Sequence, residues 1–470
     1  LGVVMAIPMK QQMINIEQLR FPSGIAAAET LRALHAGLEG ARQSRLLAQG
    51  AIVGTVVAIL RELHAKWMPW NLPEAVPFAI GKEPTLRGRP LSDYSFSFDT
   101  SIILVAAGAI MGWRPAWSMM LGAAVNYLVL APYMYSLGVI DDRLGYKYIV
   151  QWSVWFGSAL MLTSGLTAFG FQWRSVWNAM KSVANAFGKR VQTDDEAREV
   201  PMLWFVVGVA LCAPLVIALE YLVFGIKPWL GVGAGFRRLF IAIVACRVTG
   251  ETDTTPSGAL GKITQVTFGV LDPGNTTTNL MTANVGGGVG LHAADLLTDL
   301  KSGYILKADP RQQFWAQLLG VVAGSLFVVP AWALLVDGPE DFGTKWPVPA
   351  AQTWKGVAVM LAEGIGNLHP TAQISIAVGG VLGILMVLAE RAFPAARPYI
   401  PSAAGLGLGF TTPASNTISM FIGAAIATGM LRKNPKAEES IIPASSGALA
   451  GESLTAVFIR LLGITGIFGR

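Results

Sequence analysis

The sequence predicts an all-α protein that crosses a membrane many times, and three observations support this fold class. Of its 470 residues 53% are apolar and only 14% are charged, against roughly 25% charged residues in an ordinary soluble domain. The mean hydropathy is +0.51. Several uncharged runs are longer than the roughly 20 residues that a helix needs to cross a bilayer. A soluble globular enzyme and a disordered chain are both excluded.

Stretches with almost no charge give the expected spans in order. The long ones cover residues 115–140, 148–173, 202–226, 312–336, 370–389 and 398–431. The stretch 202–226 contains Glu220, and 398–431 is long enough for two passages broken at Thr412-Pro413. Shorter candidates cover residues 46–60, 100–113, 229–246 and 443–459. We expect roughly ten to twelve membrane elements in a single domain over residues 1–470.

Charge and cysteine content narrow the class of protein further. The net charge is +6, but the basic residues are spread over short loops, a pattern that records membrane topology and not nucleic-acid binding. Cys212 and Cys246 each lie in an apolar run and are expected to be packing thiols. The four histidines are dispersed, and Gly258–Lys262 lacks the spacing of a phosphate-binding loop. We therefore expect no bound metal, no nucleotide and no other cofactor.

The hydropathy pattern fails between residues 247 and 311. This segment is rich in Thr, Asn and Gly, and its residues 284–290 read Asn-Val-Gly-Gly-Gly-Val-Gly. Such a backbone cannot face lipid with unpaired amides and carbonyls, so it must be buried in protein or line a water-filled cavity. Transporters build substrate sites from broken helices of this kind. We expect discontinuous or re-entrant helices here.

One motif occurs twice. Residues 23–31 and 446–454 both read Ser-Gly-x-x-Ala-small-Glu-[Ser/Thr]-Leu, with Pro22 and Pro443 just upstream. Internal duplication is the usual origin of transporter halves. Close helix packing would explain the small residues, but it does not call for a glutamate at the same place in each copy.

Ionisable and amide side chains at membrane depth are the candidate functional residues, because they are costly there and seldom kept without a use. The carboxylates expected to couple transport to protons or cations are Glu29, Glu251, Asp253, Asp299 and Glu452. The side chains expected to bind substrate are Gln265, Asn275, Asn279, Asn284 and Tyr127. The alternatives are structural: an ion pair of Arg247 with Glu251, a water interface for Asp299 with Lys301, and core packing for Tyr127.

Taken together, these strings resemble the oligopeptide transporter (OPT) superfamily. Residues 19–34 resemble its proline-glycine-alanine-glutamate signature, and residues 250–265 resemble its second hallmark. Weaker matches are residues 279–281, 293–303, 310–313 and 451–454. The resemblance covers nearly the whole chain. The chain departs from the family in two ways. It has fewer spans before the first signature and starts abruptly at Leu1, so we expect N-terminal spans to be missing. It also has the pair Arg237-Arg238 in a segment where the family is apolar.

The resemblance implies a secondary-active, proton-coupled importer of short oligopeptides or of metal-chelate, siderophore-like complexes, as in the yellow-stripe branch. We expect a multi-pass protein of the inner (plasma) membrane that works by alternating access, with a first signature segment (1–45), a central segment (247–311) and C-terminal repeat-bearing spans (398–460). Its partners would be the lipid bilayer, the substrate and protons; the oligomeric state is open. A channel that uses the central segment as a filter is the main alternative. A membrane-embedded transferase using Asp141-Asp142 is the other.

Overall fold

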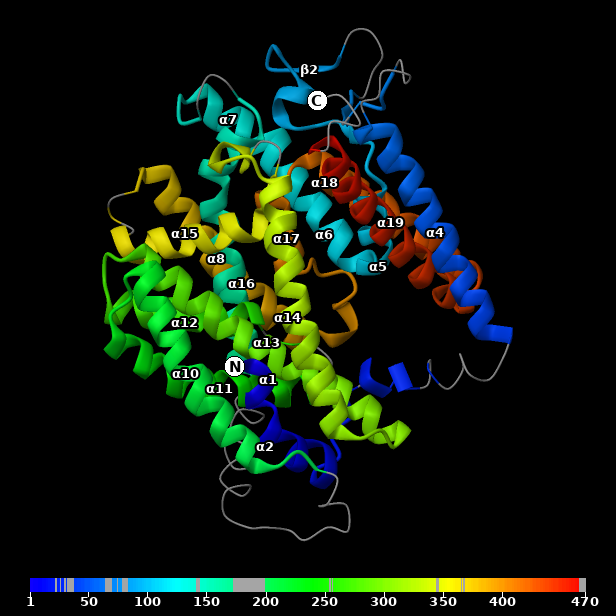
Figure 1. Ribbon diagram of the computed structural model, residues 1–470. Helices are drawn as coiled ribbons and strands as arrows, with labels where there is room; N and C mark the ends of the chain where they lie inside the picture. Colours follow the sequence, from blue (N-terminus) through cyan, green and yellow to red (C-terminus); the bar gives the residue numbers. More distant parts are fainter. Residues whose placement is uncertain are drawn as a thin grey trace. The chain divides into compact units, whose positions relative to one another are not determined.

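The computed structural model is almost entirely helical (Figure 1). It describes residues 1–21, 23–25, 27–28, 31, 38–63, 70–73, 75–77, 83–140, 144–171, 199–252, 255, 257–343, 346–364, 366 and 368–464. The chain forms two compact units, the first comprising Leu1–Ala36, Gly165–Leu326 and Val357–Asn367, and the second Gly37–Ser164, Phe327–Gly356 and Leu368–Arg470.

The first unit contains the N-terminal helices and the central segment. Its elements are α1 (Gly2–Met5), α2 (Ile7–Lys10), the π-helix η1 (Gln11–Ile16), α10 (Met202–Phe224), α11 (Pro228–Thr252), α12 (Ser257–Leu271), α13 (Thr276–Leu306) and most of α14 (Pro310–Leu335). Helices α11 and α12 both pack on α13. This packing is close because α13 carries glycines: a Cβ at Gly290 would lie 2.9 Å from the side chain of Ile241 on α11.

The second unit contains the other helices and two small hairpins. Its first elements are α4 (Leu38–Glu62), β1 (Ala75–Val76), β2 (Thr85–Leu86), β3 (Arg89–Pro90), η2 (Leu91–Tyr94), β4 (Phe98–Asp99), α5 (Ile102–Met111), α6 (Trp113–Ala124), η3 (Val125–Leu130), α7 (Ala131–Ser136) and most of α8 (Tyr146–Gly170). After η4 (Pro339–Asp341) and α15 (Pro349–Glu363), which continues into the first unit, come α16 (Pro370–Ala392), η6 (Pro394–Ala396), α17 (Ala403–Thr411), α18 (Ala414–Lys433), η7 (Pro435–Ala437) and α19 (Glu438–Ile464). Strand β1 pairs antiparallel with β4, and β2 with β3.

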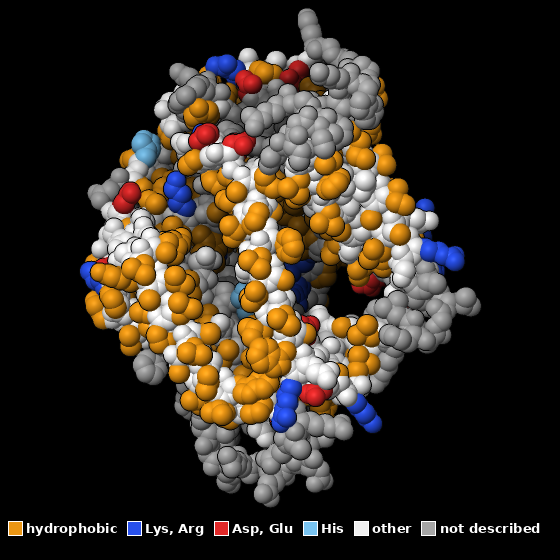
Figure 2. All heavy atoms as spheres, viewed as in Figure 1, with side chains coloured by type: hydrophobic (Ala, Val, Ile, Leu, Met, Phe, Trp, Pro, Cys, Tyr) orange, Lys and Arg blue, Asp and Glu red, His pale blue; other side chains and the backbone are white. Residues whose placement is uncertain are grey.

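The predicted fold class is confirmed. In the part of the chain that the structure describes, eight helices are long and apolar enough to cross a membrane: Arg42–Glu62, Tyr146–Ala168, Met202–Phe224, Pro228–Gly250, Pro310–Leu335, Pro370–Ala392, Ala414–Lys433 and Pro435–Ile459. Helices α10 and α14 expose apolar side chains along their length, such as Leu211, Leu222, Leu326 and Phe327. Figure 2 shows this orange apolar surface over both helices, as expected of helices that face acyl chains.

Helix breaks that bear on the sequence predictions lie at Thr412-Pro413 and on either side of α12 in the described part of the chain. Helices α17 and α18 are separated at Thr412-Pro413, as the sequence predicts. Helix α12 is bounded by breaks on both sides, and at 15 residues it is about 22 Å long, shorter than the roughly 30 Å hydrocarbon core. The glycine-rich stretch 284–290 is not itself a break. It lies inside the 31-residue helix α13, where its small residues form a packing face.

Two helix pairs of the second unit pack through glycines. Gly50 and Gly54 of α4 lie against the backbone of α19, and Gly447 and Gly451 of α19 lie against the backbone of α4, each pair with the four-residue spacing of close-packing membrane helices. A Cβ at Gly447 would lie 2.1 Å from the carbonyl oxygen of Leu47. We call this contact the α4–α19 seam. A similar contact, the α5–α18 seam, is formed by Gly108 of α5 and Gly423 of α18.

Candidate functional site

A cluster of buried polar side chains lies between α12 and α13 in the first unit. Gln265 and Asn279 are 0% and 1% exposed, and the Asn279 amide donates a 2.6 Å hydrogen bond to the Gln265 carbonyl. The Asn279 Oδ1 and Thr278 Oγ1 atoms form no hydrogen bond with the described residues. Buried polar atoms are normally paired, so the capacity of these two oxygens to accept hydrogen bonds is unused within the described residues.

Lys262 lies one helical turn before Gln265 on the same face of α12. It is 7% exposed and forms no ion pair or hydrogen bond with the described residues. A Cβ added at Gly286 of α13 would be in ordinary van der Waals contact with Thr264 of α12, and a Cβ added at Gly288 would have nothing within 4 Å. Lys262 is therefore a buried cation on a helix that packs against α13.

Lys262 differs from the other buried cations of this unit. Arg238 of α11 pairs with Glu220 of α10, and both side chains are almost fully buried. The remaining buried cations also have polar partners: Lys10 pairs with Glu199, Arg247 pairs with Glu17 at 2.5 Å, and Lys301 donates to the Gln18 amide oxygen at 3.3 Å. Two contacts explain how the apolar helix α11 accommodates two successive arginines. Glu220 neutralises the charge of Arg238. The guanidinium of Arg237 lies over the Phe268 ring, 4.2 Å from its centroid.

The other predicted substrate residues of the central segment have different environments. Asn275 caps α13: its Oδ1 accepts a 3.0 Å hydrogen bond from the Thr278 N–H, and its amide donates to Asp272. Asn284 is exposed, and so is the predicted coupling residue Asp299. The structure thus brings Gln265 and Asn279 together, while Asn275 holds a helix end and Asn284 and Asp299 lie on the surface of α13.

Tyr127 lies in the second unit and belongs to the helix break at Thr412-Pro413. Its hydroxyl donates a 2.9 Å hydrogen bond to the Thr412 carbonyl. The neighbouring carbonyl of Thr411 accepts from Tyr146 at 2.7 Å, and that of Phe410 from Ser153 at 2.7 Å. The carbonyls that Pro413 leaves without a helical partner are thus paired with side chains, as a break at membrane depth requires.

Glu452, the glutamate of the second repeat copy, is at the centre of a buried polar cluster. One carboxylate oxygen accepts from Arg61 at 2.8 Å and from the Ser101 hydroxyl at 2.9 Å. The other accepts from the backbone N–H groups of Ile102 and Ile103 at 2.9 and 3.0 Å. Helix α5 therefore begins on the Glu452 carboxylate, whose charge is favoured by the positive end of the helix dipole.

Some predicted residues lie outside the described part of the chain. These are Glu29, Asp253 and the pair Asp141-Asp142. Glu251 lies in α11, but its side chain is not described. In the described residues, no group of three His, Cys, Asp or Glu side chains is arranged to hold a metal ion. Four residues of the polar clusters were missed: Lys262, Thr278, Arg61 and Ser101. Only Lys262 carried a signal, being a lone cation within the hallmark stretch 250–265.

The comparison with known families decides which of the sequence interpretations holds. The model of the OPT oligopeptide transporter protein family matches residues 1–462. The chain belongs to this family. The family consists of transporters and not of enzymes, so the protein is a multi-pass membrane transporter and the transferase alternative is wrong.

Similar proteins come from yeast and plants. A putative oligopeptide transporter of Saccharomyces cerevisiae is 29% identical over 236 residues, which are 47% of this chain and 32% of the yeast protein. An iron-phytosiderophore transporter of Oryza sativa is 24% identical over 490 residues, covering 96% of this chain and 71% of that protein. A probable metal-nicotianamine transporter of Arabidopsis thaliana is 23% identical over 519 residues, covering 99% and 70%. The match with the yeast relative spans about a third of that protein's length.

Proposed function

We propose that this transporter is a secondary-active, proton-coupled importer of short peptides or metal-chelate complexes in the plasma membrane, working by alternating access. The family and the names of its relatives support both kinds of cargo. Peptides and amino-acid-derived chelators share two chemical features: carboxylate groups and amide or amine groups along a short backbone. A binding site for either therefore needs a cation and amide side chains.

The observation that carries this proposal is Lys262. Burying an ammonium group costs several kcal/mol unless an anion compensates it, and the described residues supply no such anion. A carboxylate of the cargo would complete the pair. The unpaired oxygens of Asn279 and Thr278 on the adjoining helix would accept N–H groups of the same cargo. In this proposal Gln265 and Asn279 bind substrate beside Lys262, with Asn275 holding the end of α13 in place.

The cargo site can be tested by uptake into proteoliposomes. We expect Lys262→Met to raise KM for a carboxylate-bearing peptide or chelate at least about tenfold, since a hydrogen-bonded ion pair contributes about 1.5–3 kcal/mol, and Lys262→Arg to restore much of the loss. Lys307→Met is the matched control because Lys307 is an exposed lysine at the end of α13. A C-terminally amidated peptide should bind weakly to the wild type and be insensitive to Lys262→Met. Unchanged KM for carboxylate cargo in Lys262→Met would refute the assignment.

Proton coupling is assigned to the carboxylates of the repeats and the central segment, namely Glu29, Glu251, Asp253, Asp299 and Glu452. Glu251→Gln is the first variant to test, because Glu251 adjoins the break between α11 and α12. We expect it to abolish the dependence of uptake on an imposed pH gradient while leaving thermal stability intact. Undiminished proton-driven uptake by Glu251→Gln would exclude that role. Accumulation of cargo against its own gradient in the wild type would exclude a channel.

A further inference from the structure

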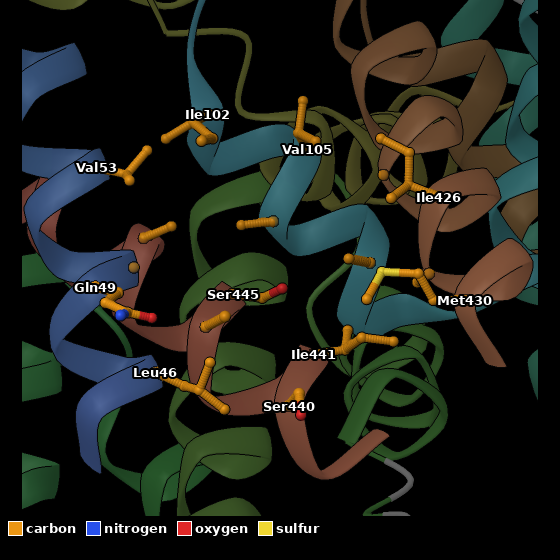
Figure 3. A pocket seen from close by; sticks show the side chains of 17 residues that line it. Leu46, Gln49, Val53, Ile102, Val105, Ile426, Met430, Ser440, Ile441 and Ser445 are labelled. Carbon is orange, nitrogen blue, oxygen red and sulfur yellow. The ribbon is translucent and has the colours of Figure 1, made fainter. Parts of the chain in front are cut away.

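The second unit contains an apolar groove of about 430 Å³ whose lining does not include Glu452, Arg61 or Ser101. Four helices form it: α4, α5, α18 and α19. Figure 3 shows side chains of all four pointing into it, with Val53 from α4, Ile102 and Val105 from α5, and Ile426 and Met430 from α18. The polar side chains that line it are Gln49, Ser440 and Ser445. Its volume is in the range of pockets that hold small ligands.

The groove follows from the two glycine seams. The α4–α19 seam and the α5–α18 seam each hold two helices at close distance. Seven of the 17 lining residues are glycine or alanine, including Gly50, Ala106, Ala427, Ala444 and Ala448. Residues this small cannot fill the space between the two pairs. A side chain at a glycine of either seam would clash with the facing helix backbone, so the groove follows from the close packing of the two helix pairs.

The groove lies on helices that face lipid. Helices α4, α18 and α19 are all candidate membrane spans, and each exposes large apolar side chains, such as Ile52 on α4, Ile426 on α18 and Leu454 on α19. An apolar groove on such helices suits the acyl chains of a bilayer, whereas peptides and metal chelates are polar. Its natural occupant is therefore a hydrocarbon chain.

The end of the groove near Met430 and Ser440 is basic. Arg432 and Lys433 end α18, two and three residues after Met430, and Lys436 lies in the short turn before α19. All three are exposed, and none forms an ion pair with the described residues. Arg42 also lies at this end, where it donates a 3.1 Å hydrogen bond to Ser440. Two acidic side chains, Glu438 and Glu439, are exposed nearby, so the local excess of charge is positive.

We propose that this groove binds an anionic phospholipid of the bilayer. One acyl chain occupies the groove between the two seams, and the phosphate and headgroup lie against Arg432 and Lys433. The protein offers a site for the acyl chain and a site for the headgroup, because the apolar groove and the basic cluster adjoin along α18. The lipid would fill a void that the small residues of the seams cannot fill, and so would stabilise the pairing of α4 and α19 with α5 and α18.

The proposal can be tested by native mass spectrometry of the purified protein with phosphatidylglycerol and phosphatidylcholine of identical chains. We expect phosphatidylglycerol to be retained at least about tenfold better, since each basic residue near an anionic lipid contributes about 1 kcal/mol. R432Q/K433Q should abolish this preference and leave phosphatidylcholine binding unchanged. K307Q/R397Q is the matched control, because it removes two exposed charges that do not line the groove.

A second set of variants tests the groove itself. Ser445→Phe places a ring where Ser445 lines the groove, and Val53→Trp fills it from α4, where Val53 is 47% exposed and a larger side chain is tolerated. Either variant should reduce retention of both lipids, while Ser445→Ala should not. Equal retention of the two lipids by the wild type, or full retention by both filled variants, would overturn the proposal. So would a disulfide between V53C and I426C of two different molecules, since a second copy would then occupy the groove.

Discussion

Replacement of Glu452 by glutamine separates charge from shape, because the two side chains have nearly the same size. The carboxylate accepts four hydrogen bonds, two on each oxygen, whereas an amide has one accepting oxygen and one donating NH2 group. In the less costly orientation the oxygen keeps the two backbone N–H groups of α5. The NH2 group then faces Arg61 and Ser101; the serine hydroxyl can turn to accept, but the guanidinium of Arg61 loses its acceptor.

This loss sets the expected magnitude. Removing one partner of a buried ion pair costs about 3–5 kcal/mol. Because Arg61 still has the Asp99 carboxylate at 3.9 Å, we expect the lower end of this range. Glu452→Gln should therefore lower the free energy of unfolding by about 3 kcal/mol. Tryptophan fluorescence during thermal unfolding in detergent measures it, with Glu438→Gln in the exposed first turn of the same helix as control. If Glu452→Gln melts at the same temperature as Glu438→Gln, the reasoning that the Glu452 carboxylate stabilises the fold through Arg61 and the start of α5 is wrong, whether or not the variant also loses pH-dependent uptake.

Two further predictions concern buried contacts of the helices. Glu220→Gln should destabilise the protein by about 3–5 kcal/mol because Arg238 is left buried and unpaired, while the double variant E220L/R238L should recover most of that loss. Thermal unfolding of the two variants measures both effects. A double variant as unstable as the single one would contradict the explanation. Gly451→Leu should prevent stable folding, measured by size-exclusion chromatography, because a Cβ there would lie 2.1 Å from the Ala51 carbonyl oxygen. Gly429→Leu is its control, since nothing lies within 4 Å of that position, and normal behaviour of Gly451→Leu would show that the seam is not tight.

The fold class and the long spans could be predicted from the sequence because uncharged runs of about 20 residues have few alternatives to a membrane helix. The break at Thr412-Pro413 was predictable for a similar reason, since proline lacks the N–H that a helix interior needs. Residues 284–290 were harder to interpret. Their glycines and asparagine weaken a helix locally, but packing against α11 and α12 stabilises α13 and overrides that propensity.

The polar clusters show what local patterns leave out. The glutamate of the second repeat was identified, but its partners Arg61 and Ser101 lie about 390 and 351 positions away in the sequence, and no local pattern connects them. Lys262 stood in the recognised hallmark, yet its significance depends on the absence of an acidic neighbour among the described residues, which is a property of the folded chain. Tyr127 was chosen for its depth in an apolar run, and its bond to Thr412 became visible only with the helix break.

The α4–α19 seam has a consequence for how the protein is made. Thr55 of α4 contacts Gly451 of α19 across 396 positions of the chain. At about 5–20 residues per second, roughly 20–80 s of synthesis separate the two surfaces. During that interval the glycine face of α4 has no partner from its own chain and meets only lipid or other proteins in the membrane. Assembly of the second unit therefore cannot be completed before α19 is made, and nascent chains halted before α19 should be the forms that quality-control proteases remove.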